Sequence, residues 1–155
     1  MRDNISTRNP DTVLKVFNLF VETAHAVLKD ADSHLYRGAG ISAGKFVVLM
    51  VLASSGGTMT AAKLAERSST KPHNITKLVD RMKRDGLVAA ERRDVDRRFV
   101  YIQLTDKGRG VIAKAMPAAR ETVARIMASI SEPDLAVLER LLSVLKQNTR
   151  SGSVK

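Results

Sequence analysis

Residues 92–99 read RRDVDRRF and place four arginines around two aspartates. Guanidinium groups bind phosphate and carboxylate oxygens through paired hydrogen bonds. Asp96 stands two residues before Arg98, close enough for its carboxylate to hold that guanidinium in one orientation. Arg93 lies before the pair and Arg97 lies between its two members, and both could bind phosphates. The cluster predicts either a contact with an anionic partner or a charged turn exposed to water.

A second polar group lies upstream, where residues 72–84 carry apolar side chains at helical spacing. Its members crowd the start of this predicted helix: Thr70, Lys71, His73, Asn74, Thr76 and Lys77. Asparagine pairs with adenine through two hydrogen bonds, and lysine reaches guanine acceptors. Helix N-termini also favour phosphate. Arg81, Lys83 and Arg84 lie further along, where they would touch a phosphate backbone or face solvent; of these, contact is expected for Arg81.

The overall charge agrees with an anionic partner. The 155 residues include 26 Lys and Arg against 16 Asp and Glu, which leaves a net charge of +10. Such an excess suggests nucleic acid or a membrane surface. A membrane-binding helix would need a broad apolar face to spare, and residues 72–84 need theirs for packing. No apolar run approaches the ~18 residues of a membrane span. The N-terminus lacks the apolar core of a secretory signal, so we expect a cytoplasmic protein.

The elements that must position these residues follow from caps and periodicity. Asn9-Pro10-Asp11 begins a long helix, and Ser42 and Thr60 begin two shorter ones. Gly86 ends the helix over 72–84. Alternating apolar residues around the arginine cluster predict a β-hairpin. Further helices begin at Thr105-Asp106 and at Ser131, and Pro117 should kink the first of these two.

The order of these elements predicts a mainly α fold with a small β-wing. Residues 42–104 form a winged helix-turn-helix, and residues 10–36 and 105–149 form long flanking helices. Residues 150–155 are expected to be a flexible tail. The flanking helices carry more apolar surface than one small domain can cover, so their natural partner is a second copy of the chain. Packing against each other within one chain is the alternative.

The segments KLAERSSTKPHNITKLVDRMKRDGLV and RRDVDRRFVYIQLTDKG resemble the MarR family of bacterial transcription regulators. The most specific parts are Asp96-x-Arg98, Leu104-Thr105-x-x-Gly108, and Leu64-Ala65 followed by Leu78-Val79-Asp80-Arg81. The resemblance covers nearly the whole chain. It implies a homodimer built by the terminal helices, a recognition helix in the major groove and a wing in the minor groove. Many members are repressors that release DNA when a small ligand binds.

The chain departs from the family pattern at three places. The turn before the recognition helix reads Ser68-Ser69-Thr70, where apolar residues and a glycine are usual. Lys71 precedes Pro72, where Ser, Thr or Asp is usual. Ala90 stands where the strand usually ends in arginine. These departures concern which bases are preferred and leave the fold expectation unchanged.

The sequence gives little support for an enzymatic or a metal-binding site. The chain has no Gly-rich phosphate loop and no cysteine, which excludes thiolate metal sites and thiol-based sensing. His25 and His34 are nine residues apart and so do not share a helical face. A metal site completed by acids of a partner chain is the weaker alternative. We therefore expect no enzyme, no cofactor and no metal.

The sequence as a whole predicts a dimeric, sequence-specific DNA-binding regulator. We expect this regulator to be a repressor. Its partner would be double-stranded DNA with an inverted-repeat operator. A small-molecule effector is also expected, and its candidate lining residues are Phe20, His34, Tyr36 and Phe46. The alternative is a winged-helix module that binds proteins and no specific DNA.

Overall fold

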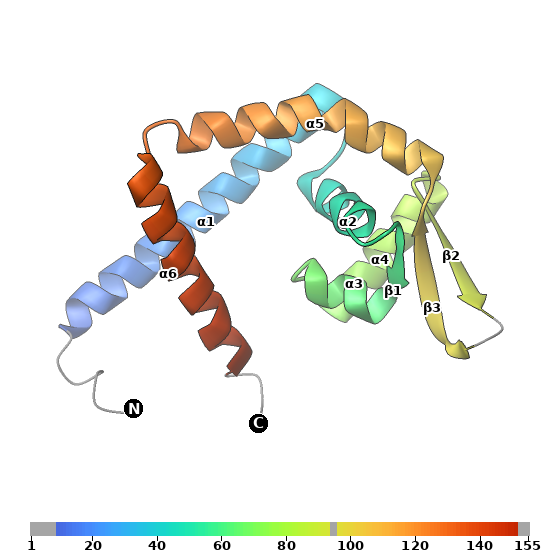
Figure 1. Cartoon of the computed structure of the whole chain (residues 1–155), viewed down its shortest axis with the longest axis horizontal. Helices are drawn as coiled ribbons and strands as arrows, with labels where there is room; N and C mark the ends of the chain where they lie inside the picture. Colours follow the sequence, from blue (N-terminus) through green and yellow to red (C-terminus); the bar gives the residue numbers. More distant parts are fainter. Residues whose placement is uncertain (1–8, 94–95, 152–155) are drawn as a thin grey trace. The chain divides into compact units, whose positions relative to one another are not determined.

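The computed structural model describes residues 9–93 and 96–151, and the side chains of residues 92–98 and 150–151 lie outside this description. The chain forms two compact units that divide between Thr122 and Val123. The described part of the chain contains six helices and three strands, and Figure 1 shows their labels. The architecture is therefore mainly helical with a small sheet, as the sequence predicted.

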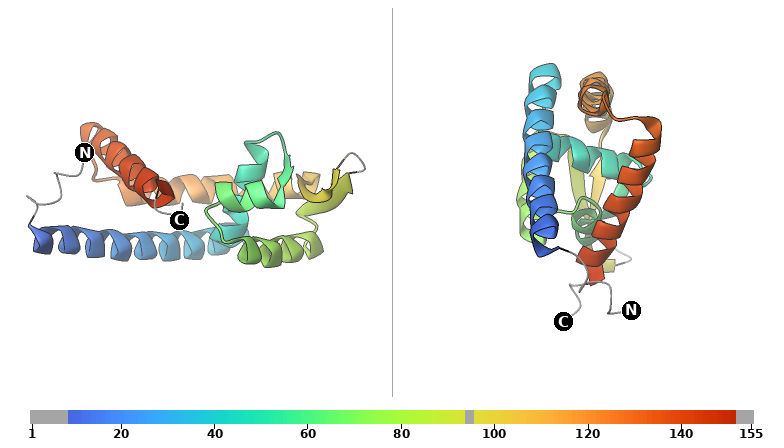
Figure 2. Two further views of the ribbon diagram at one scale, coloured as in Figure 1. Left: turned by 90° about the horizontal axis from the view of Figure 1, so that it is seen from below. Right: turned by 90° about the vertical axis from the view of Figure 1, so that its left-hand side faces the viewer.

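The first helix, α1 (Pro10–Ala39), is one continuous rod in both views of Figure 2. It begins as predicted, because the Asn9 side chain accepts a hydrogen bond from the Asp11 N–H at 3.0 Å. Its end was predicted wrongly at residue 36. The helix runs three residues further and stops at Gly40, which adopts a left-handed φ of 68° while its N–H donates to the Tyr36 carbonyl.

The next elements build the helix-turn-helix: α2 (Ala43–Ala53), β1 (Thr58–Thr60), α3 (Ala61–Arg67) and α4 (Pro72–Arg84). Ser42 and Thr60 cap α2 and α3 through hydrogen bonds to the N–H groups of Lys45 and Lys63. Ser69, in the turn between α3 and α4, has a positive φ of 51°. The turn therefore adopts a left-handed conformation at a serine.

Strands β2 (Val88–Arg93) and β3 (Asp96–Leu104) form the predicted hairpin, which extends away from the helices in Figure 1. The sheet is antiparallel with the order β1-β3-β2. Val88 pairs with Leu104 and Glu91 with Tyr101, and the register becomes irregular between Arg92 and Arg93. The arginine cluster therefore lies at the end of the hairpin where regular pairing stops.

A single apolar core supports this part of the chain. Its fully buried members come from α2, α3, α4 and β3: Val48, Leu49, Leu52, Leu64, Ile75, Met82 and Ile102. Helix α5 (Asp106–Met127) joins it through Ala115, which is completely buried, and continues through Pro117. Near Pro117 the backbones of α1 and α5 come close, because a Cβ added to Gly38 would lie 2.9 Å from the Ala118 Cβ.

The second unit contains the end of α5 and helix α6 (Glu132–Ser151). Ser131 begins α6 as predicted, with its hydroxyl accepting from the Asp134 N–H at 3.4 Å. The helix passes the predicted boundary at 149 and includes residues 150 and 151, because no glycine or proline interrupts it before Gly152. The remainder of the predicted tail, residues 152–155, lies outside the described residues.

No single helix in the described ranges is long and apolar enough to cross a membrane, although α1 and α2 taken together, with an 81° bend between them, meet the length and composition required.

Candidate nucleic-acid interface

Helix α4 divides cleanly into a buried face and a polar face. Ile75, Val79 and Met82 are at most 5% exposed and anchor the helix in the core. The predicted contact residues His73, Asn74, Thr76, Lys77 and Arg81 are all exposed, and Thr70 is half-buried. The structure thus gathers the predicted contacts on one side of one helix, available to a partner.

The start of α4 has no side-chain cap. Lys71 occupies the N-cap position, and its side chain makes no capping hydrogen bond. Its carbonyl accepts from the N–H groups of Asn74 and Ile75. Thr76 donates its hydroxyl to the Pro72 carbonyl at 3.1 Å, which leaves the hydroxyl oxygen able to accept a further bond. The first turn therefore combines a positive helix end with side chains that can read base edges.

The end of α4 is held by an ion pair that the sequence did not reveal. Lys45 of α2 contacts Asp85, the residue after α4, with 2.6 Å between Nζ and Oδ2. The hydrogen bond and charge of Lys45 hold the pKa of Asp85 below its usual value of 3.8, and Lys107 and Arg84 add to this effect. Forty residues separate the partners, so no local pattern announces the pair.

The motif Leu104-Thr105-x-x-Gly108 forms a joint between α4, the wing and α5. The single proton of the Thr105 hydroxyl is shared between the carbonyls of Gly86 at 2.8 Å and Leu87 at 2.9 Å, and the hydroxyl oxygen accepts from the Gly108 N–H at 3.0 Å. A Cβ on Gly108 would lie 2.3 Å from the Leu87 carbonyl oxygen. The motif therefore brings two backbones together at a distance that only glycine permits.

The backbone of the hairpin places Arg93 in β2 and Asp96, Arg97 and Arg98 in β3, with Asp96 paired to Arg93. The side chains of these four residues lie outside the described part of the chain. The predicted orientation of Arg98 by Asp96 therefore stays a prediction.

The four predicted effector residues do not form one pocket within one chain. Phe20 and Tyr36 are 42% and 66% exposed. Phe20 lies 14 residues before His34 on α1, about 21 Å along the helix axis at 1.5 Å per residue. Phe46 packs against the core instead. The effector assignment stays a prediction.

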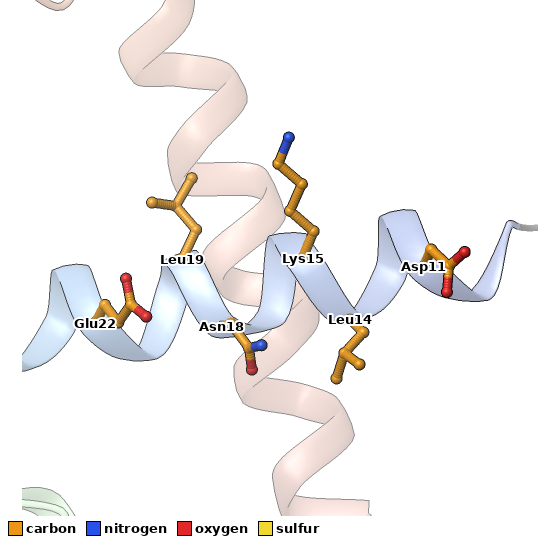
Figure 3. Close-up of a pocket in the computed structure, with 6 residues that line it drawn as sticks. All are labelled: Asp11, Leu14, Lys15, Asn18, Leu19 and Glu22. Carbon is orange, nitrogen blue, oxygen red and sulfur yellow. The ribbon is translucent and has the colours of Figure 1, made fainter.

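His34 and Tyr36 have different surroundings. The His34 Nδ1 lies 3.2 Å from the Asp30 carbonyl and 3.4 Å from Arg37 Nη2. Tyr36 lines an open hollow of about 440 Å³ together with Asp32, Ser33 and Arg37. A hollow of about 490 Å³ lies nearer the start of α1, and Figure 3 shows its six lining residues, all from this helix. None of the predicted effector residues lines the second hollow.

Among the described residues, no group of three His, Asp or Glu side chains could hold a metal ion.

Comparison with known proteins agrees with this geometry. A model of the MarR family matches residues 39–98, which hold the helix-turn-helix and most of the wing. The winged domain is similar to those of MarR-family regulators. The prediction from the sequence motifs is confirmed, and so is the prediction of a DNA-binding transcription regulator and not an enzyme.

The family relationship extends beyond the winged domain. The transcriptional repressor YetL of Bacillus subtilis is 27% identical over 143 residues, which cover 92% of this chain and 83% of YetL. The ligand-free structure of the organohalide-sensing regulator RdhR is 25% identical, with a TM-score of 0.81 over 100% of this chain and 90% of that chain. The similarity to MarR-family regulators therefore extends over the flanking helices.

A third relative shows the fold alone. The MarR-family regulator Sco3205 of Streptomyces coelicolor, whose structure is a complex with DNA, is 20% identical with a TM-score of 0.84. The match covers 91% of this chain and 89% of that chain. The winged helix-turn-helix fold predicted from the sequence is confirmed.

Proposed function

We propose that this MarR-family regulator is a homodimeric repressor that binds an inverted-repeat operator and releases it when a small effector binds. The observation that carries the proposal is the exposed polar face of α4, which presents Asn74 and Lys77 near the start of the helix. YetL is named a repressor, and RdhR is named a sensor of organohalides. These names support repression and effector release here.

The dimer follows from surface that one chain leaves uncovered. On α1, Val16, Phe17 and Leu28 are 61%, 59% and 63% exposed. Soluble monomers rarely leave so many large apolar side chains along one helix in water. A two-fold pair would present two α4 helices about one helical turn of DNA apart, roughly 10 base pairs, so the operator should be an inverted repeat.

The direct test selects binding sites from random-sequence duplexes and then compares variants on the selected site. We expect Asn74→Ala to lose about 1–3 kcal/mol and to relax the preference at one base position. Lys77→Ala should weaken binding to all duplexes and lower the salt slope by about one unit per contacted phosphate. Lys83→Ala removes the same charge further along α4 and is the matched control, with a smaller effect.

The outcomes distinguish DNA recognition from a protein-binding module. Specific DNA binding must weaken steeply as salt rises, because phosphate contacts release counterions. A wild-type chain that selects no sequence, or whose binding ignores salt, would contradict the proposal.

A further inference from the structure

The turn between α1 and α2 is closed by a side chain that comes from two turns earlier in α1. The Asp32 carboxylate accepts a hydrogen bond from the Ala43 N–H, the first of α2, at 2.8 Å. Between the helices, Gly40 is left-handed and Ile41 is 4% exposed. The two helix axes differ by 81°. The bond therefore ties the body of α1 directly to the start of α2 across this bend.

Helix α2 is packed firmly into the winged domain, so the two would move together. Leu49 and Leu52 of α2 are completely buried in the core that also holds α4. Lys45 adds the ion pair to Asp85 at the end of α4. A change in the angle between α1 and α2 would therefore carry the recognition helix with it.

Helix α5 is the second connection between the winged domain and the flanking helices, and it contains a position at which it could bend. The joint at Thr105 and Gly108 fixes the start of α5 to the wing. Further along α5, Pro117 has no N–H to donate within the helix. The next residue, Ala118, lies against Gly38 of α1, and both residues are small, so the two helices approach closely here. Gly38 and Ala118 thus form a close crossing point about which the winged domain could rotate.

We propose that Asp32 is a positioning residue for DNA binding: its bond to the Ala43 N–H sets the angle between α1 and α2 and hence the spacing of the two recognition helices. This inference rests on the proposed dimeric function. At 1.5 Å per residue, α2 is about 16 Å long, so a rotation of about 10° moves its far end by about 3 Å. One base pair rises about 3.4 Å, so such a rotation shifts the register on DNA by nearly one step.

The first experiment measures the angle without DNA. The chain has no cysteine, so Lys29→Cys on α1 and Lys83→Cys on α4 provide the two sites for spectroscopic labels. Both side chains are exposed. An excess of unlabelled chain limits each assembly to one labelled copy. Asp32→Ala should broaden or shift the distribution of label distances, and Asp32→Asn, which keeps an accepting oxygen, should retain the wild-type distribution.

The second experiment measures the consequence on DNA. Duplexes carry the selected half-site alone, or two half-sites with the spacing changed by one or two base pairs. Wild type should lose about tenfold or more in affinity per base pair of altered spacing, because simultaneous engagement fails. Asp32→Ala should bind the half-site like wild type and lose about threefold or less across the same spacings. Asp32→Asn should restore the wild-type spacing preference.

Ser42→Ala is the matched control for a purely structural effect. Ser42 also caps α2, but its hydroxyl accepts from Lys45 within the same helix and makes no bond to α1. This variant should lower the melting temperature about as much as Asp32→Ala and leave both the label distances and the spacing preference unchanged. Where Asp32→Ala does not fold, Asp32→Ser takes its place.

An unchanged distance distribution and an unchanged spacing preference in Asp32→Ala would overturn the positioning role, as would an equal change in Ser42→Ala. Failure of the proposed function looks different. In that case the wild-type chain selects no inverted repeat, while the label distances within one chain still respond to Asp32→Ala.

Discussion

Ser69 holds a backbone conformation that glycine adopts at lower cost. Its φ of 51° lies in the left-handed region, and its N–H donates to the Glu66 carbonyl at 3.1 Å. A residue with a Cβ loses about 1–2 kcal/mol there, and glycine gives back about 0.4–1 kcal/mol through the greater freedom of the unfolded chain. Glycine is the usual residue in this turn of the family that the sequence resembles, which agrees with the geometry.

We expect Ser69→Gly to raise the melting temperature by about 1–3 °C, since 1 kcal/mol corresponds to about 2–4 °C in a chain of this size. Ser68→Gly is the control, because Ser68 has a negative φ of −83° and its hydroxyl donates to the Leu64 carbonyl. It should lower the melting temperature. Calorimetry on both variants decides, and an equal change in both would show that the turn is not strained.

The wing gives a prediction whose sign separates two mechanisms. In the first mechanism, the negative potential of a narrow minor groove attracts arginines by charge alone. In the second, Asp96 orients Arg98 and so reduces the entropy that Arg98 loses when it enters the groove. Arg98→Ala should weaken operator and random DNA alike by about tenfold. Asp96→Ala should also weaken binding, although it removes a negative charge. Tighter binding of Asp96→Ala in a fluorescence titration would leave the cluster as a generic basic patch.

Two elements, α2 and α4, are joined by the pair of Lys45 and Asp85, and acid should loosen this joint. Because the pKa of Asp85 is lowered in the folded chain, the pair stabilises the fold above the unfolded pKa of about 3.9. That contribution disappears as the pH falls through the lowered folded value. Asp85→Asn should flatten the loss of stability below about pH 4. Denaturant unfolding between pH 2 and 6 measures this, and an unchanged slope would contradict it.

The joint between the wing and α5 makes a sharper prediction with a control in the same helix. Gly108→Ala would place a Cβ 2.3 Å from the Leu87 carbonyl oxygen, so we expect a loss of about 2–3 kcal/mol or more. Gly110→Ala meets nothing within 4 Å and should stabilise the helix by about 0.5–1 kcal/mol. Denaturant unfolding of both variants tests this. A similar change in both would mean that the motif does not join the elements closely.

Elements with strong local signals could be predicted from the sequence. Pro72 at the start and Gly86 after the end define α4, and the structure agrees at both bounds. The end of α1 could not be predicted, because Gly38 reads as a breaker and stays helical where it packs against Ala118. The exposed face of α4 was predictable from periodicity. The partners Asp32–Ala43 and Lys45–Asp85 were not, because such pairings depend on how distant segments fold together.

At the scale of the whole molecule, the two ends of the chain leave apolar surface in water. Phe17 of α1 is 59% exposed, and Leu141 and Leu142 of α6 are 47% and 40% exposed. Each fully covered side chain of this kind contributes about 1.5–3 kcal/mol. A partner that covers several of them gains enough to associate at micromolar concentration. Because most soluble oligomers are symmetric assemblies of one chain, the partner that fits is a second copy of the chain.

Light scattering should therefore give twice the chain mass at micromolar concentration. Phe17→Glu should shift the protein to monomer with little change in its fold, since this side chain packs against little in one chain. Val47→Glu is the control: Val47 is 44% exposed but lies on α2, outside both proposed dimerisation segments. Removal of residues 131–155 should give a monomer or an unfolded chain.

The Phe17→Glu monomer should bind the inverted repeat only as tightly as a half-site, because it loses the avidity of the pair, about 100-fold or more. A wild-type chain that scatters as a monomer, or a Phe17→Glu monomer that keeps full operator affinity, would contradict the two-fold arrangement.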